Sequence, residues 1–447
     1  MFAKVLVANR GAVAARVVRA LGGLGVRSVA VYSEADAGAA YVAEADEAYA
    51  IGPAPARDSY LNQDRLLEVA VQCGADALHP GYGFLSENAG FARRVEAAGL
   101  RFIGPSPRWI EAMGVKTQAR ALMAEHGMPM TAGSGLLGAD AAEISAAAAR
   151  IGYPVLIKPA AGGGGIGMLA AADEAALLVA VERSRAMASR SFSSAQVYLE
   201  KLVERPRHVE FQMLGDRHGA LRHLFERDCS VQRRHQKVIE ESPAPGLPRE
   251  RATAMAEAAA AILATLGYDN IGTVEMLLGA DGQFSFLEMN TRLQVEHAVT
   301  EMVTGIDLVA AMIRVAAGAR LAEVLPARIS LEGHAIEARV YAEDPVRFLP
   351  SPGPLLRFRP PAATAALRVE TGYREGMVVT PYYDPLLAKV IVHAATREVA
   401  TAELREALAA FEVVGIKTNI AFIQRVLASD AFRGGAVHTG LATDLPN

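Results

Sequence analysis

Cysteine is scarce in this sequence of 447 residues, which contains only Cys73 and Cys229. Two cysteines cannot build a disulfide scaffold or a CxxC metal site, and they fit buried thiols in a reducing compartment. Long apolar runs are also missing, because none approaches the roughly 18 residues that would span a bilayer. The opening MFAKVLVANRG predicts a strand and a turn in place of a signal peptide. We therefore expect a cytoplasmic protein without membrane partners.

Positive charge is not in excess, since 45 Lys and Arg residues are outnumbered by 49 Asp and Glu residues and the net charge is −4. Nucleic-acid-binding proteins usually carry a basic surface, and membrane-surface proteins a basic amphipathic helix. Neither feature is present, so we expect no nucleic acid among the partners. The chain is too long for one core and predicts about two to four domains.

Strands and helices alternate over roughly the first hundred residues. Apolar runs at 4–8, 28–32, 46–51 and 75–79 predict buried strands, with helices at 13–24 and 61–72 between them. This order predicts a doubly wound α/β domain with a parallel sheet. The first turn has a single Gly11 and lacks GxGxxG, which disfavours a nicotinamide dinucleotide site. The loop HPGYGFLSEN at 79–88 follows a strand end, where ligands bind in such sheets, but a plain structural turn fits it equally well.

A glycine-rich loop follows a second buried strand in YPVLIKPAAGGGGIGM at 153–168. Such a loop can present backbone N–H groups to phosphate oxygens, and Lys158 at the end of the strand would add a positive charge. A flexible linker is the alternative, but linkers usually mix glycine with serine and do not follow a buried strand that ends in lysine. The pattern therefore favours a phosphate-binding loop.

The stretch FSFLEMNTRLQVEH at 284–297 alternates polar and apolar residues. In an extended chain one face would be apolar and suited to a core. A helix would instead place Glu288, Arg292 and Glu296 in a surface ion-pair ladder, but the weak helix formers around them disfavour it. We predict a strand with one polar face, formed by Glu288, Asn290, Arg292, Gln294 and Glu296.

Residues 273–278 and 284–290 predict a hairpin around Asp281 and Gly282. Such a hairpin can set Glu275 across from Glu288, and two facing carboxylates repel unless a cation lies between them. Mg²⁺ prefers hard oxygen ligands and is often held by one or two carboxylates with substrate phosphates. Glu275, Glu288 and Asn290 supply such a set, so together with the glycine loop the sequence predicts an Mg–ATP site.

Taken in order, these motifs resemble those of the biotin carboxylases, which belong to the ATP-grasp ligases. The resemblance runs from about residue 5 to 418 and is carried by ANRG at 8–11, HPGYGFLSEN at 79–88, YPVLIKPAAGGGGIG at 153–167, ERDCSVQRRHQK at 226–237, FLEMNTRLQVEH at 286–297 and PYYDPLLAKV at 381–390. It implies an α/β and α+β, ATP-grasp fold in three parts. These are a Rossmann-like pre-ATP-grasp domain at 1–115, an ATP-grasp domain at 116–317 with a mobile lid at about 131–203, and a C-terminal α+β domain at 330–440.

The resemblance implies ATP-dependent carboxylation of biotin by bicarbonate through carboxyphosphate. ATP and Mg²⁺ or Mn²⁺ would be the cofactors, and carrier-bound biotin the substrate. The implied metal ligands are Glu275, Glu288 and Asn290. The implied nucleotide contacts are Lys116, Lys158, Gly162, Gly163, Gly164, Gly165, Gly167, Glu200, Lys201, Leu202, His208, Gln232, His235, Glu275 and Glu288. The implied bicarbonate and biotin contacts are Lys237, Arg292, Gln294, Val295, Glu296 and Arg339.

Four of these residues are the expected catalytic groups. Glu296 would be the base that deprotonates bicarbonate, while Arg292 and Lys237 would hold the anion. Arg339 would stabilise the biotin enolate.

Two positions depart from the family pattern. Ile166 stands in the glycine loop where many relatives have arginine, which removes a cation near the phosphates and resembles the urea or guanidine carboxylase branch. Ala12 stands where relatives often have glutamate. The final carboxyl acceptor is left open by this pattern.

The resemblance also implies partners. These are a biotin carboxyl carrier protein, a carboxyltransferase subunit or domain, and a second copy of the chain in a homodimer. Arg16 and Arg19 could contribute to that interface, although an ordinary solvated face is favoured. The chain would be either a free-standing subunit or the N-terminal part of a larger enzyme. Two other functions stay open: half of a carbamoyl-phosphate synthase, which would lack the HQK and RLQVEH motifs, and an inactive nucleotide-binding subunit, which only Ile166 supports.

Overall fold

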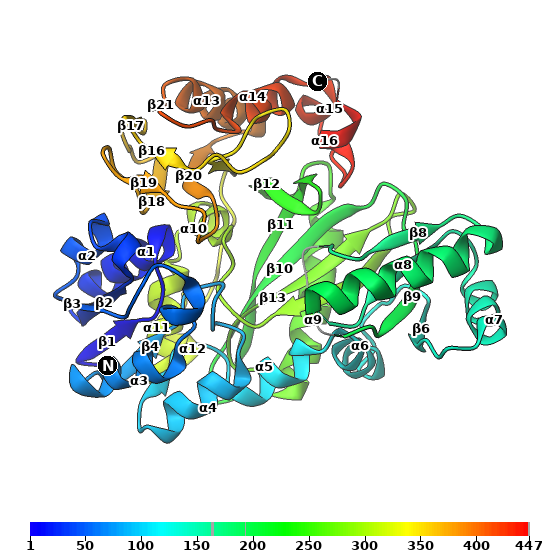
Figure 1. The fold of residues 1–447 in the computed structure, drawn as a ribbon, viewed down its shortest axis with the longest axis horizontal. Helices are drawn as coiled ribbons and strands as arrows, with labels where there is room; N and C mark the ends of the chain where they lie inside the picture. The colour runs from blue at the N-terminus through cyan, green and yellow to red at the C-terminus, as the bar shows by residue number, and fades with distance from the viewer. Residues whose placement is uncertain (162–164, 193, 446–447) are drawn as a thin grey trace.

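A parallel sheet forms the N-terminal region in the computed structural model, which describes residues 1–161, 165–192 and 194–445 (Figure 1). Its strand order is β3-β2-β1-β4-β5. The apolar run Val5, Leu6 and Val7 is fully buried because helices cover both faces of the sheet. The predicted doubly wound α/β domain is thereby confirmed. Its elements are β1 (Lys4–Val7), α1 (Gly11–Gly23), β2 (Arg27–Tyr32), η1 (Glu34–Asp36), α2 (Ala40–Glu44), β3 (Glu47–Ala50), η2 (Ala56–Asp58), α3 (Gln63–Gln72), β4 (Ala77–His79), α4 (Ala89–Ala97), β5 (Arg101–Phe102) and α5 (Pro107–Gly114).

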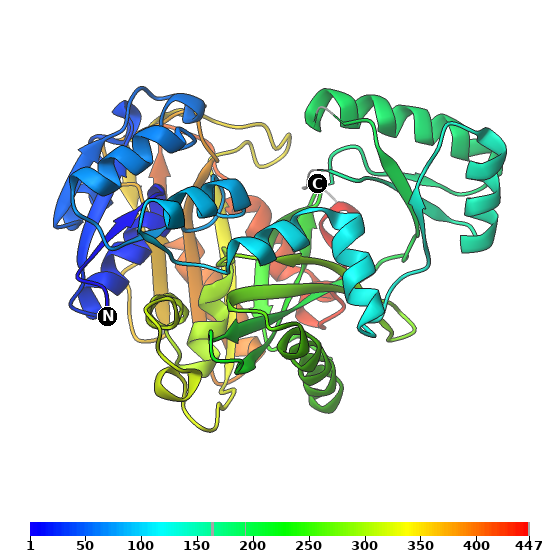
Figure 2. The same ribbon diagram turned by 90° about the horizontal axis from the view of Figure 1, so that it is seen from below.

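A smaller region projects from the body and is seen at the right of Figure 2. It contains an antiparallel sheet with the order β6-β9-β7-β8 and its own apolar core, which includes Ile144, Val155 and Leu177. We call residues 133–201 the lid. Its elements, with the helix that leads to it, are α6 (Lys116–Glu125), β6 (Gly133–Leu136), α7 (Ala141–Ile151), β7 (Val155–Pro159), β8 (Leu169–Ala171), α8 (Glu174–Phe192) and β9 (Val197–Lys201).

An eight-stranded antiparallel sheet forms the centre of the molecule, with the order β14-β13-β10-β11-β12-β15-β20-β18. Strand β12 pairs with β15, so the sheet continues from the middle of the chain into its C-terminal part. The predicted antiparallel strands of that part are therefore confirmed as a continuation of this sheet. Its strands are β10 (Arg207–Gly215), β11 (Leu221–Arg233), β12 (Gln236–Ser242), β13 (Asn270–Leu278), β14 (Phe284–Asn290), β15 (His334–Tyr341), β18 (Leu367–Thr371) and β20 (Leu386–Ala394).

Helices pack on this sheet, and two short antiparallel strand pairs, β16 with β19 and β17 with β21, complete the C-terminal part. Among the described residues, no helix combines the length and apolar character needed to cross a bilayer. The remaining elements are α9 (Arg249–Leu266), α10 (His297–Thr304), α11 (Leu308–Ala316), α12 (Leu321–Val324), β16 (Gly353–Pro354), β17 (Arg357–Arg359), β19 (Val378–Val379), α13 (Arg397–Ala409), β21 (Glu412–Val414), α14 (Ile420–Ala428), α15 (Asp430–Arg433) and α16 (Leu441–Asp444).

The predicted hairpin of β13 and β14 is confirmed, and Glu275 pairs directly with Glu288 in its register. The prediction that the strand continues to residue 297 is wrong, because β14 ends at Asn290 and α10 begins at His297. The backbone N–H of Thr291 bonds to a side-chain carboxylate and the carbonyl of Val295 accepts from Lys389, so neither group joins a strand. We call residues 291–296 the connecting segment.

Candidate active site

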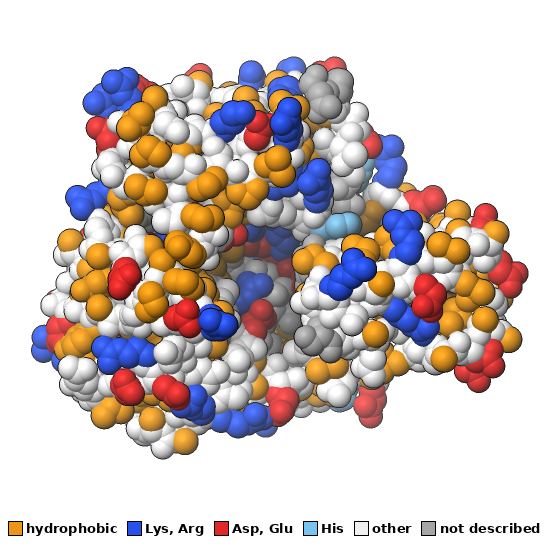
Figure 3. Space-filling view, in the orientation of Figure 1, with side chains coloured by type: hydrophobic (Ala, Val, Ile, Leu, Met, Phe, Trp, Pro, Cys, Tyr) orange, Lys and Arg blue, Asp and Glu red, His pale blue; other side chains and the backbone are white. Residues whose placement is uncertain are grey.

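A cavity of about 1190 Å³ opens between the three regions of the molecule. Figure 3 shows the hollow between the body and the lid, with charged side chains on its floor. The structure brings most of the predicted site residues to this one cavity. Its lining includes Lys116, Lys158, Gly165, Glu200, Lys201, Leu202, His208, Gln232, His235, Lys237, Glu275, Glu288, Asn290, Arg292, Gln294, Val295, Glu296 and Arg339.

The predicted glycine loop is only partly described. Gly162, Gly163 and Gly164 lie outside the described residues. Gly167 is buried within the lid, where its carbonyl accepts a hydrogen bond from Ser184, and it does not line the cavity. Gly165 does line it and lies so close to the ring of His235 that an added Cβ would overlap that ring. Glycine at 165 therefore lets the lid approach the turn between β11 and β12.

Lys237 lies on the floor of the cavity and contacts three carboxylates. Its Nζ donates to carboxylates at 2.6 Å from Glu210, 2.8 Å from Glu275 and 2.7 Å from Glu296. Burial alone would lower the pKa of Lys237, but the three carboxylates raise it well above its usual value. The ammonium is therefore charged. It joins β10, β13 and the connecting segment, which carry the three carboxylates.

Glu296 is fully buried at the end of the connecting segment. Besides Lys237, its carboxylate accepts from Arg339 at 2.8 Å, and Arg339 in turn lies 2.5 Å from Glu240. Burial raises the pKa of Glu296, but Lys237 and Arg339 hold it well below the usual range for glutamate. The side chain is therefore a carboxylate at neutral pH.

The predicted metal ligands lie at the hairpin. Lys237 contacts Glu275, and Lys116 lies 2.9 Å from Glu288. The Oδ1 of Asn290 accepts from Arg292 at 2.8 Å. Two carboxylates and an amide oxygen form a hard-oxygen donor set, which fits Mg²⁺ when the paired cations move aside.

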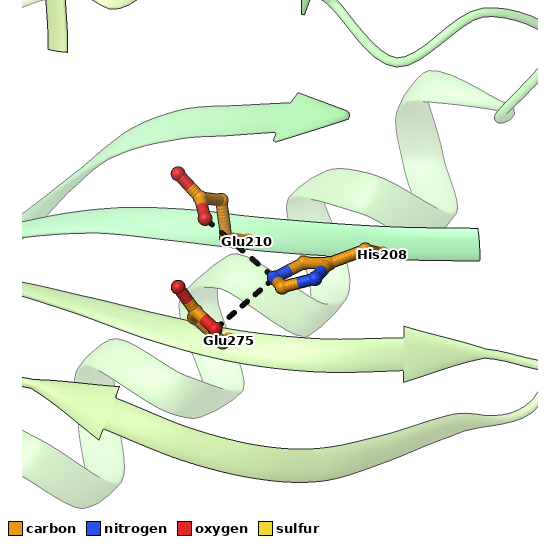
Figure 4. Close-up of side chains that lie close together, drawn as sticks. All are labelled: His208, Glu210 and Glu275. Atoms are coloured by element: carbon orange, nitrogen blue, oxygen red, sulfur yellow. Dashed lines mark ion pairs between the residues drawn. The ribbon is translucent and has the colours of Figure 1, made fainter. Parts of the chain in front are cut away.

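His208 adds a nitrogen to this region, as Figure 4 shows. Its Nε2 lies 3.2 Å from Glu275 and 3.7 Å from Glu210. These three side chains form a cluster with metal-binding chemistry that the sequence did not predict. An imidazole is a poor ligand for Mg²⁺, which prefers oxygen, so His208 serves better as a partner of the Glu275 carboxylate.

All three nitrogens of the Arg292 guanidinium donate hydrogen bonds. Its Nε donates to Glu87 at 3.0 Å, and one terminal nitrogen donates to Gln294 at 2.6 Å. The other terminal nitrogen donates to Asn290. Gln294 also donates to Glu275 at 3.0 Å, so the predicted bicarbonate and metal residues form one connected network.

Several of the predicted nucleotide contacts lie on the lid, where they line the cavity. Lys158 is buried and pairs with Glu200 at 3.0 Å, and burial lowers the pKa of Lys158. Lys201 donates to the carbonyls of Gly152 and Tyr153, so its ammonium is used within the lid. The side chain of Lys201 therefore ties the end of β9 to the turn between α7 and β7.

The sequence analysis missed three carboxylates of this network: Glu87, Glu210 and Glu240. Glu210 could have been found, because in the alternating run RHVEFQML it shares a face with His208. Glu240 lies in a densely charged run whose local sequence resembles a solvated face. Glu87 becomes visible only in three dimensions, because its partners are more than 200 residues away.

Family models match the chain in three segments. They are the "Biotin carboxylase, N-terminal domain" at residues 1–110, the "Carbamoyl-phosphate synthase L chain, ATP binding domain" at 115–324 and the "Biotin carboxylase C-terminal domain" at 337–443. The middle model alone would be compatible with a carbamoyl-phosphate synthase half. The matches on either side of it are to biotin carboxylases.

Curated relatives agree with these matches. The biotin carboxylase of Halalkalibacterium halodurans is 48% identical over 444 residues, which cover 99% of this chain and 98% of that protein. The mitochondrial methylcrotonoyl-CoA carboxylase subunit alpha of Rattus norvegicus is 47% identical over 98% of this chain, which spans 61% of that longer protein.

A solved structure shows the same fold over the whole length. It is the biotin carboxylase domain dimer of Hydrogenobacter thermophilus 2-oxoglutarate carboxylase in complex with MgADP, ADP and bicarbonate, at a TM-score of 0.94, 42% identity and full coverage of both chains. The ATP-grasp fold, with its Rossmann-like N-terminal domain and C-terminal domain, is thereby shown for this chain. The chain belongs to the biotin carboxylase family.

Proposed function

We propose that this cavity carries out the ATP-dependent carboxylation of biotin by bicarbonate, the reaction of its family. The observation that carries the proposal is the single network of Lys237, Glu296, Arg292 and Gln294 on the floor, beside the hairpin carboxylates. It combines a base, an anion clamp and a metal-binding donor set within one cavity. Lys116 and Lys158 supply positive charge for phosphates on the side of the lid.

We propose ATP and Mg²⁺ as the cofactors, with Mn²⁺ as a substitute. Glu275, Glu288 and Asn290 would hold the metal, which when bound neutralises charge on the phosphates. Lys116 and Glu288 are an ion pair in this structure, and Lys116 would be available to phosphate oxygens once Glu288 held the metal. His208, Gln232 and the backbone at 200–202 would complete the nucleotide site.

The first chemical step is deprotonation of bicarbonate by Glu296. The carboxylate is ionised, as a base must be, but Lys237 and Arg339 keep its pKa low and so make it a weak base. If Lys237 and Arg292 turn to the bicarbonate anion, Glu296 loses a partner and becomes more basic. Bicarbonate would then attack the γ-phosphate of ATP, which gives ADP and carboxyphosphate.

The second step places carbon dioxide, released from carboxyphosphate, next to biotin. The phosphate left behind would take the proton from the ureido nitrogen. Arg339 borders the cavity between Glu240 and Glu296 and would stabilise the enolate of biotin. Closure of the lid would keep water away from carboxyphosphate, which otherwise hydrolyses.

We propose a biotin carboxyl carrier protein and a carboxyltransferase subunit or domain as partners, and a homodimer as the assembly. The dimeric Hydrogenobacter domain supports the homodimer. Arg16 pairs with Glu301 and Asp307 of its own chain, so it is not the solvated residue that the sequence favoured. The two buried free thiols support a cytoplasmic location. We also propose that the domains of the chain meet near residues 115 and 330.

The test is ATP cleavage by the purified chain with free biotin. We expect phosphate release that requires Mg²⁺ and bicarbonate and that rises when biotin is added. Glu296→Gln should nearly abolish it while a fluorescent ATP analogue still binds. Failure of the wild-type chain to turn over with all four components would support the inactive nucleotide-binding subunit instead.

A further inference from the structure

The loop at 81–88 of the N-terminal region has a fixed shape but no role in the steps above. The amide of Asn9 donates to the carbonyls of Pro80 at 2.6 Å and Tyr82 at 2.9 Å. The loop then ends at Asn88, whose side chain caps α4. Glu87 precedes this cap and points away from its own domain, toward the connecting segment. The loop that carries the Glu87 carboxylate is thus anchored at both ends, by Asn9 and by Asn88.

Glu87 bridges two successive residues of the connecting segment. One carboxylate oxygen accepts from the backbone N–H of Thr291 at 3.1 Å, and the other accepts from Nε of Arg292 at 3.0 Å. With Nε turned to Glu87, the two terminal nitrogens of Arg292 point the other way, to Asn290 and Gln294. These are the nitrogens that could clamp bicarbonate in a bidentate manner.

Other carboxylates compete for the same guanidinium. Glu296 and Glu275 both lie close enough to raise the pKa of Arg292, together with Glu87. Without Glu87, we expect the guanidinium to turn toward these two negative charges. Arg292 would then neutralise the base Glu296 instead of facing the anion.

We propose that Glu87 is a positioning residue in the bicarbonate site. Glu87 acts through Arg292, because it fixes the plane of the Arg292 guanidinium. This inference rests on the proposed function and adds a contribution of the N-terminal region to the chemistry. An isolated ion pair at a side chain with 40% exposure would be worth little to stability. The contact with both a backbone N–H and a side chain is better suited to orientation.

The experiment compares Glu87→Ala, Glu87→Gln and Glu87→Asp with the wild-type chain in bicarbonate-dependent ATP cleavage. We expect Glu87→Ala to raise the KM for bicarbonate at least about tenfold and to leave the KM for ATP within about twofold. Glu87→Gln should lie between, because its single carbonyl oxygen can serve only one of the two donors well. Glu87→Asp should resemble alanine, because it is one methylene too short to bridge them. Equal changes in both KM values, or none, would overturn the inference.

A double-mutant cycle with Arg292→Ala tests whether Glu87 acts through Arg292. If it does, Glu87→Ala should add less than about twofold to the loss of residual activity in the Arg292→Ala chain. Full additivity would contradict the inference. Glu68→Gln, which removes an exposed carboxylate of the same region, is the matched control and should behave as wild type. Absence of turnover in the wild-type chain would instead refute the proposed function itself.

Discussion

Glu275 and Glu288 face each other directly across the β13–β14 hairpin, and a different lysine neutralises each carboxylate. Carboxylates in register on a sheet repel one another, so the pair needs cations nearby. Lys237 serves Glu275 and Lys116 serves Glu288. A divalent metal at this position would take over the neutralisation of both and free the two ammonium groups for anionic substrates.

Replacing Glu288 should therefore weaken the use of Mg²⁺. Glu288 is the better of the two for mutation, because its side chain is 30% exposed whereas Glu275 is buried in the floor network. For Glu288→Gln we expect the Mg²⁺ concentration that gives half-maximal ATP cleavage to rise at least about tenfold, since loss of even an outer partner of a metal costs that much. The measurement is a Mg²⁺ titration at saturating ATP.

Glu412→Gln provides the control for this titration, because it removes an exposed carboxylate on β21. Its Mg²⁺ dependence should match the wild type. An unchanged half-maximal concentration in Glu288→Gln would remove Glu288 from the set of metal ligands.

Lys237→Met should destabilise the fold strongly. It leaves three buried carboxylates without their shared cation, and breaking such a buried pair costs about 3–5 kcal/mol. In the wild type, Glu275 and Glu296 have pKa values well below their usual range, so their stabilisation is complete above the ordinary glutamate pKa and is lost only as pH falls through the lowered values. In the variant these acids can take up protons, so its deficit should shrink as pH falls from 7 to 5.

Thermal unfolding midpoints at pH 5, 6 and 7 check this prediction. Lys417→Met removes an exposed partner of Asp344, and loss of this surface pair should change the midpoint little at any of these pH values. A Lys237→Met midpoint equal to that of Lys417→Met would mean that the floor carboxylates do not depend on Lys237.

Local sequence was sufficient to predict those parts of the site whose hydrogen bonds join residues close together in the chain. Alternation and the Asp281–Gly282 turn predicted the hairpin and the Glu275–Glu288 pairing, because strand pairing and a tight turn are encoded by neighbouring residues. The end of β14 could not be predicted in this way. It depends on Glu87 and Lys389, which lie 204 and 94 residues from the backbone groups they bind.

The same limit explains the charged run at 226–241. A run this rich in charge is usually a solvated face, and only its position between strand-like segments indicated that part of it is extended and points inward. The segment forms β11 and β12 in the middle of the central sheet. Arg227 is fully buried there and bonds to Glu210 at 2.6 Å. Burial of these charges is possible because partners on β10 and β15 are supplied by pairing across the sheet, which the local sequence does not reveal.

Two buried acids that interact with Arg339 should make the stability depend on pH in the opposite direction to Glu275 and Glu296. Glu240 and Glu337 are register neighbours on β12 and β15 and are fully buried. Burial raises the pKa of Glu240 to about 8 and that of Glu337 to about 7, although Arg339 and Lys389 oppose the shift. The fold binds these protons more tightly than the unfolded chain, so their contribution is complete below the ordinary glutamate pKa and is lost as pH rises through 7–8.

Glu337→Gln tests this relation, because it keeps the shape of the side chain and removes its titration. Stability of the wild type should fall by up to about 1.4 kcal/mol per pH unit for each proton released, and the variant should show a shallower decline. Unfolding midpoints between pH 5.5 and 8.5 measure the slopes, with the exposed Glu403→Gln as control. Equal slopes in variant and wild type would show that Glu337 does not titrate in this range.

Ile166→Arg should strengthen ATP binding. Ile166 is 48% exposed and follows Gly165, which borders the cavity, so an arginine here could reach the phosphates. A guanidinium forms charge-assisted hydrogen bonds with phosphate oxygens, and we expect the KM for ATP to fall about three- to thirtyfold. Ile166→Gln is the matched control, because it adds a polar side chain without charge. The gain from arginine should shrink as ionic strength rises from 0.05 to about 0.5 M, since salt screens an exposed cation. If arginine and glutamine give the same KM, the loop does not lie at the phosphates.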